Sequence, residues 1–145
     1  MHVRHILAAL GAVFAAALAL APPAAADTYE YQIAVQGDLW AHEDAASSDY
    51  RYGIAIYEDD GDEIYIEDYA KDGMRVAAFW SIPSLNRTGL CVNTGGKDSL
   101  HECDKDFPDG HTIYIKFAGR CNGDVSPCNK LSQYANGAAT DSTDT

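Results

Sequence analysis

Residues 50–68 read YRYGIAIYEDDGDEIYIED, and this stretch decides the predicted fold. Apolar and polar side chains alternate on both sides of an acidic turn, which is the pattern of two half-buried β-strands. A two-residue loop, Asp60-Gly61, would pair Ile56 with Tyr65 and leave the apolar faces of the strands on opposite sides of the ribbon. A three-residue loop at residues 59–61 brings these faces together and gives Gly61 the positive φ of a bulged turn. We therefore predict a β-hairpin whose inward pairs are Ile56 with Ile64 and Ile54 with Ile66.

In this register the outer face of the hairpin combines tyrosine rings with carboxylates. Tyr57 lies opposite Glu63, and Tyr65 and Glu67 share the same face. Tyr114, in a later strand, is also predicted to point outward. Exposed tyrosine is typical of protein-binding surfaces, because its ring gives a large contact area at small entropic cost. We predict that these five residues bind a partner; the alternative is that the rings cover their own sheet.

The first residues have the features of a secretory signal peptide. Residues 1–26 combine Arg4, an apolar run, two prolines and a final alanine triplet. The apolar run, residues 6–20, is shorter than the ~20 residues of a membrane-spanning helix, which disfavours an anchor. We predict an extracellular protein whose mature chain begins at Asp27 and has no membrane association.

The composition is strongly acidic. The 145 residues include 22 Asp and Glu against 10 Lys and Arg, which gives a formal net charge of −12. Cleavage after residue 26 would remove one base, Arg4, and no acid, so the mature chain would carry −13. Such a charge disfavours nucleic acids and anionic lipids as partners and suits a cationic protein surface.

The four cysteines predict two disulfides, since an even number in an exported chain is read as a disulfide framework. Three connectivities exist, and we favour Cys91–Cys103, as a bridge between adjacent strands, with Cys121–Cys128 closing a short loop. Zinc is the competing interpretation. The spacing C-x11-C-x17-C-x6-C lacks the close pairs of structural zinc sites, so we expect no metal.

The rest of the chain predicts an all-β domain over residues 27–135. The expected features are a strand at residues 27–35, a connection at 38–49 anchored by Trp40, a central strand at 74–82, a short hairpin of 90–93 with 100–103, a strand at 112–119, and a disordered polar tail at 136–145. About seven strands with turn signals at intervals near 8 to 12 residues are typical of an antiparallel β-sandwich.

The sequence carries no recognisable catalytic motif. His42, His101 and His111 stand in none of the nucleophile, zinc-hydrolase or deaminase patterns. Two acidic runs, residues 58–63 and 104–109, are rich in oxygen but lack the spacing of a calcium loop. We expect no cofactor and no enzymatic activity; a small secreted hydrolase is the weaker alternative.

Residues 106–121 read DFPDGHTIYIKFAGRC and resemble small disulfide-bonded proteins exported by Streptomyces and its relatives. One such class is the adaptor subunit of umbrella toxin particles. The resemblance implies a non-enzymatic linker that joins a lectin to a repeat-built toxin subunit in an antibacterial complex. An inhibitor of a secreted enzyme is the competing function.

We expect the partner to dock on or beside the outer face of the hairpin. The second candidate surface is the strand at residues 27–35. A strand at a chain terminus can form a sheet edge, and the open backbone groups of an edge can pair with another protein.

Overall fold

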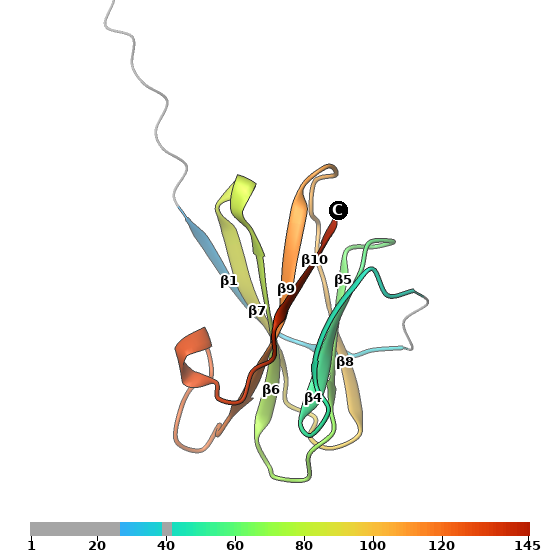
Figure 1. Ribbon diagram of the computed structural model, residues 1–145. Helices are drawn as coiled ribbons and strands as arrows, with labels where there is room; N and C mark the ends of the chain where they lie inside the picture. The colour runs from blue at the N-terminus through green and yellow to red at the C-terminus, as the bar shows by residue number, and fades with distance from the viewer. Residues whose placement is uncertain (1–26, 39–41) are drawn as a thin grey trace, which may run out of the picture.

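The computed structural model describes residues 27–38 and 42–145, which form a sandwich of two five-stranded sheets (Figure 1). The predicted signal peptide and Trp40 lie outside the described residues. Sheet A contains, in spatial order, β1 (Thr28–Ile33), β7 (Arg87–Asn93), β6 (Arg75–Ile82), β9 (Thr112–Cys121) and β10 (Thr140–Asp144). Sheet B contains β2 (Val35–Gln36), β8 (Ser99–Asp104), β5 (Glu63–Asp68), β4 (Gly53–Glu58) and β3 (Ala45–Asp49). The β-sandwich prediction is confirmed, but the described part of the chain has ten strands rather than seven.

The first predicted strand divides between the two sheets. Residues of β1 pair with β7 in parallel, whereas β2 pairs with β8 in the antiparallel sense. The switch occurs at Ala34, whose side chain is buried and whose N–H donates to the Val92 carbonyl (2.9 Å). The β1–β7 pair is the parallel exception in an otherwise antiparallel sandwich.

The predicted hairpin exists, but its predicted register is wrong. Ile56 lies opposite Tyr65, and residues 59–62 form the turn. The side chains that reach the core between the sheets are Ala55, Tyr57, Ile64 and Ile66. A buried tyrosine needs a partner for its hydroxyl, and the Tyr57 hydroxyl donates to Asp62 Oδ1 (2.7 Å). Asp62, with a φ of 56°, thus makes the inward tyrosine possible.

One short polar segment forms a strand that the sequence pattern does not reveal. Residues 45–49 read AASSD and form β3, while residues 50–52 form the turn into β4 rather than its first residues. The hydroxyl of Ser47 accepts the Phe117 N–H (2.9 Å) and donates to the Ala139 carbonyl. This bond ties β3 of sheet B to β9 of sheet A, so small polar side chains here mark close contact between sheets.

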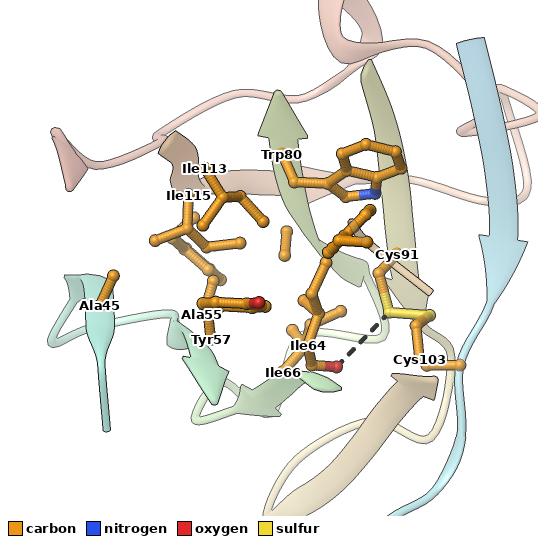
Figure 2. Close-up of a cluster of buried hydrophobic side chains, with 14 of the residues drawn as sticks. Ala45, Ala55, Tyr57, Ile64, Ile66, Trp80, Cys91, Cys103, Ile113 and Ile115 are labelled. Carbon is orange, nitrogen blue, oxygen red and sulfur yellow. Dashed lines mark hydrogen bonds between the residues drawn. A yellow bond between two sulfur atoms is a disulfide. The ribbon is translucent and has the colours of Figure 1, made fainter. Parts of the chain in front are cut away.

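The central strand is confirmed. β6 lies between β7 and β9, and Pro83 begins the 3-10 turn η1 (Pro83–Leu85) directly after it. One face of β6 enters the core between the sheets, where Figure 2 shows Trp80 with Ile113 and Ile115 of β9. The other face carries Ala77 and Phe79 into a second, smaller cluster on the outer side of sheet A. Both faces are apolar because both are covered.

The predicted disulfides are both present, but the predicted hairpin around the first is not. Cys91 belongs to β7 in sheet A and Cys103 to β8 in sheet B, so their disulfide joins the two sheets across the core (Figure 2). The side-chain nitrogen of the buried Asn93, in sheet A, donates to the carbonyls of Ile66 and Ser99 in sheet B. These hydrogen bonds join the same two sheets as the disulfide. Two disulfides are consistent with folding in an oxidising compartment.

The prediction of a disordered tail is wrong. β10 pairs antiparallel with β9 at the edge of sheet A. The chain end is held by two backbone bonds, from the Thr145 N–H to His111 (2.8 Å) and from the Gly110 N–H to Thr145 (2.9 Å). The composition of residues 136–145 is that of a flexible segment, but backbone pairing with an existing edge needs no apolar side chain.

Candidate binding site at the first strand

The first strand presents an exposed apolar row that we call the β1–β2 surface. It consists of Tyr29, Tyr31, Ile33 and Val35, whose side chains are 47%, 41%, 43% and 61% exposed. Alternation puts the first three on the outer face of sheet A. Isolated exposed apolar residues are common, whereas a contiguous row is a feature of interaction sites.

The backbone of β1 is open along the side that faces away from β7. The N–H groups of Thr28 and Ala34 donate to β7-side carbonyls, those of Asn86 (2.8 Å) and Val92 (2.9 Å). In a parallel ladder, residues of the same parity point the same way, so Tyr29, Tyr31 and Ile33 direct their N–H and C=O groups outward. Among the described strands β1 pairs with β7 alone, and these backbone groups are therefore available.

A network of two cations and one carboxylate fixes β1 with its tyrosines outward. Glu30 points to the inner side, where its Oε1 accepts from Arg87 Nε (3.0 Å) and Nη2 (2.9 Å). Its Oε2 lies 3.5 Å from Lys105 Nζ. Arg87 and Lys105 both stand over the ring of Trp80, and burial lowers the pKa of Lys105. Rotating the strand would remove the carboxylate partner of two partly buried cations, and this secures the orientation of β1.

The second disulfide positions residues 129–133, which we call the wall, beside β1. The segment after Cys121 returns through Cys128 to the 3-10 turn η2 (Leu131–Gln133), orange-red in Figure 1. The Tyr29 hydroxyl donates to the Asn129 carbonyl (2.7 Å), and the Tyr134 hydroxyl donates to the Cys128 carbonyl (2.8 Å). The wall and β1 border a pocket of about 490 Å³ that is open to solvent. It is lined by Tyr29, Tyr31, Asn129, Lys130, Leu131 and Ser132.

The outer face of sheet A continues the aromatic character of β1. The register aligns one row across all five strands: Tyr29, Thr88, Ser81, Tyr114 and Ser142. The next row is Tyr31, Leu90, Phe79, Lys116 and Thr140. These ten positions hold no carboxylate, although the chain has 22 Asp and Glu. The face is therefore chemically distinct from the rest of the surface.

The outer face of sheet B is acidic instead. Glu63 lies opposite both Glu58 and Asp104, and Glu102 lies on the same face beside Tyr65. Burial, together with Glu63, Asp38 and Asp104, raises the pKa of Glu102. Like charges on directly opposed residues repel, and the Tyr65 hydroxyl, which donates to Glu63, offsets part of this repulsion.

Replacing Glu102 by Gln should stabilise the fold at neutral pH. The pKa of Glu102 is higher in the folded than in the unfolded chain, so its ionised form destabilises the fold, and this penalty disappears as the pH falls through the folded pKa. We expect Glu102→Gln to have the higher unfolding midpoint at pH 7 and to match the wild type near pH 4. Asp60→Asn, in the exposed turn, is the control; an equal gain of Glu102→Gln at both pH values would contradict this origin.

The five predicted binding residues do not form one surface. Tyr57 is fully buried in the core between the sheets, so its predicted outward placement is wrong. Tyr65 does lie on the outer face of sheet B, but it is only 4% exposed. Glu63 and Glu67 lie half-buried on the outer face of sheet B. Tyr114 does point outward, at 41% exposure, but from sheet A. Of the five, Tyr114 alone shares a face with the β1–β2 surface.

The residues of the β1–β2 surface had a signal in the sequence. Their alternation with Glu30 and Gln32 is plain in the sequence. Tyr29, Tyr31 and Ile33 share the outer face of sheet A, whereas Val35 belongs to sheet B, opposite Glu102. Alternation alone predicts that this apolar face points into the core, as the apolar face of a strand normally does. The partly buried ion pairs of Glu30 reverse that expectation, and they depend on residues 57 and 75 positions later in the chain.

The histidines are dispersed. His42 lies 3.3 Å from Asp44 and His101 belongs to β8, whereas His111 Nδ1 lies 2.9 Å from the hydroxyl of Ser84. Ser84 also lines a shallow pocket of about 220 Å³, together with Pro83, Thr112 and Tyr114. Among residues 27–38 and 42–145, no third group hydrogen-bonds the other nitrogen of His111, and no three His, Cys, Asp or Glu are grouped to hold a metal.

No helix in the described part of the chain is long and apolar enough to cross a membrane. No protein-family model, curated protein or solved structure matches the chain.

Proposed function

We propose that this chain is a secreted, non-enzymatic protein-binding module that docks its partner on the β1–β2 surface. The observation that carries the proposal is the exposed apolar row of Tyr29, Tyr31, Ile33 and Val35 along an open strand edge. Covering this row removes apolar area from water, and tyrosines provide rigid contact area at small entropic cost. Tyr31 lies at the centre, between the strand edge and the pocket wall, where energetic hot spots concentrate.

Two chemically different outer faces favour an adaptor over an inhibitor. The outer face of sheet A includes aromatic side chains, and the two rows described above hold no carboxylate. The outer face of sheet B instead carries Glu63, Glu67, Glu102 and Asp104. An inhibitor needs one complementary surface, whereas an adaptor needs two. The arrangement therefore supports the adaptor, with a lectin and a repeat-built toxin subunit as its proposed partners.

Hydrolysis is the second candidate, and one contact favours it. The hydroxyl of Ser84 and Nδ1 of His111 stand at the distance of a nucleophile and its base. Ser84 is exposed, and in the described residues His111 lacks the third group that would orient its ring. A pair without an orienting group is a weaker basis for function than the β1–β2 surface.

Tyr31→Ala should weaken partner binding strongly, and Tyr50→Ala should not. Loss of a central aromatic anchor costs about 2–4 kcal/mol of binding free energy, or roughly 30-fold to 1,000-fold in affinity. Tyr50 is the matched control, because it is 91% exposed in the turn before β4 and belongs to neither outer row. The measurement is the affinity of the two variants for the protein that co-purifies with the wild type from culture medium at low salt.

The identity of the co-purifying protein separates the finer proposals. A lectin together with a repeat protein supports the adaptor, and a single protease or glycosidase supports the inhibitor. Equal affinities of wild type and Tyr31→Ala, with the fold and both disulfides intact, would remove the β1–β2 surface from the proposal. A monomer that loses hydrolytic activity on Ser84→Ala would replace the proposal by the enzyme.

A further inference from the structure

We propose that the partner binds by adding an extended segment to the open edge of β1, as a sixth strand of sheet A. The segment has apolar side chains at alternate positions and Lys or Arg at the end that lies beside β2. This inference rests on the proposed function and specifies how the β1–β2 surface is used. The partner is a protein with an exposed or flexible strand, not a second copy of this chain.

The backbone of β1 supplies the first argument. Tyr29, Tyr31 and Ile33 each direct one N–H donor and one C=O acceptor away from β7. Water satisfies these groups in the free protein, and an added strand would satisfy them in an ordered ladder. The register of β1 with β7 runs without a shift over all six residues, so the open edge is straight and continuous.

The absence of protection along β1 is the second argument. Natural sheet edges are usually guarded by lysine, proline, a bulge or an inward charge that prevents pairing with another chain. The sequence TYEYQI has no lysine, no proline and no bulge, and its one charge, Glu30, is held by Arg87 and Lys105. The opposite edge strand, β10, is by contrast polar throughout, with the sequence TDSTD.

The pocket beside β1 accounts for one side chain of the added strand. Alternate residues of a strand on this edge would project to the outer face of sheet A, the face on which Tyr29, Tyr31 and Leu131 line the pocket. The volume of about 490 Å³ accommodates an aromatic or large aliphatic side chain, with room left for water. A fixed pocket at one position sets the register, as side-chain pockets do in other strand-addition complexes.

Charge specifies the other end of the segment. The chain leaves sheet A at Ala34 and continues through β2, which ends at Gln36, to Asp38. A Cβ atom at Gly37 would lie 2.9 Å from the Glu102 carboxylate, so this acid stands directly against the end of β2. Glu63 and Asp104 belong to the same acidic group. A Lys or Arg of the added strand placed here would relieve the repulsion among these carboxylates.

The same charges disfavour self-association. Two copies pairing through β1 would each carry a formal net charge of −12, or −13 if residues 1–26 are removed. A basic segment from another protein gains the attraction that a second copy would lose.

The test uses a displayed library of random nine-residue peptides, selected on the wild-type protein with intact disulfides. We expect enriched peptides to alternate apolar residues and to carry Lys or Arg near one end. Methylating the backbone nitrogens of one alternate set of residues should abolish binding, and methylating the other set should leave it within about threefold. The inference would be overturned if no peptide is enriched, if the enriched peptides show no alternation, or if both methylated sets have equal effects. A wild-type protein that is already a dimer through β1 would also overturn it.

Paired substitutions distinguish strand addition from contact by side chains alone. Both Tyr31→Ala and Tyr31→Pro remove the ring, but only proline removes the outward N–H while leaving the ladder to β7 intact. Tyr31→Pro should bind the selected peptide at least about tenfold more weakly than Tyr31→Ala. Ile33→Pro and Ile33→Ala repeat the comparison if Tyr31→Pro does not fold. Equal losses in each pair would overturn strand addition and leave the proposed function standing; no loss in any variant would end both.

Discussion

Replacing Cys91 and Cys103 together by alanine is expected to lower the free energy of unfolding by about 3–5 kcal/mol. The disulfide closes a loop between residues 12 positions apart and joins the two sheets across the core. Removing such a bridge from a small domain releases chain entropy in the unfolded state and typically costs about 2–5 kcal/mol. Both sulfurs are buried, so truncation also leaves unfilled volume in the core, which adds to the loss.

The second disulfide is the matched control. Cys121 and Cys128 lie only 7 positions apart, and Val125 in the segment between them is 81% exposed. Their double replacement by alanine is expected to cost about 2 kcal/mol or less of global stability. It should instead lower affinity for the partner, because the Asn129 carbonyl and the pocket wall lose their tether. Denaturant unfolding of both double variants measures the difference, and equal losses would contradict a dominant role for the cross-sheet bridge.

Gly89→Ala is expected to destabilise the fold by about 2–3 kcal/mol and to loosen β1. A Cβ atom at Gly89 would lie 2.6 Å from the indole ring of Trp80 and 2.7 Å from the carbonyl oxygen of Glu30. Trp80 is fully buried against Phe107, with the ring centroids 4.9 Å apart, so the indole has no room to retreat. Overpacking of this kind typically costs about 1–3 kcal/mol. The β1 carbonyl is the group that can move.

The neighbouring residue provides the control for Gly89. Thr88 lies one position earlier in β7, and its half-exposed side chain points to the outer face of sheet A. Thr88→Ala should change the unfolding free energy by no more than about 0.5 kcal/mol. If Gly89→Ala were as stable as the wild type, the close approach of β1 to Trp80 would not be a constraint on the first strand.

Strands with strong apolar periodicity could be predicted from the sequence. β6 and β9 have the predicted extents within a few residues, and Val76, Trp80, Ile113 and Ile115 face the core. Their side chains determine their own environment, because each strand must bury one or both apolar faces. Both disulfides could also be predicted from local sequence, because each joins two consecutive cysteines of the chain.

The failures have a different cause, which is a polar partner that the apolar alternation does not record. Tyr57 faces the core because Asp62 accepts its hydroxyl hydrogen, and Glu30 faces inward because Arg87 and Lys105 hold it. Neither partnership leaves a mark in the local alternation. β3 and β10 were missed for a related reason, since their small polar residues pair through the backbone. The outward direction of the β1 tyrosines therefore depends on residues far along the chain, which the local pattern of β1 does not include.

Residue-resolved hydrogen exchange, with and without the bound partner, tests the central claim most directly. The claim is that the open edge of β1 and its outward tyrosines form the docking surface. In the free protein, the amides of Tyr29, Tyr31 and Ile33 should exchange rapidly, while those of Glu30 and Gln32, which point to β7, should be protected. Binding should protect the first set and leave the second unchanged. Protection that appears instead in the turn at residues 59–62, with the β1 amides unaltered, would contradict the account.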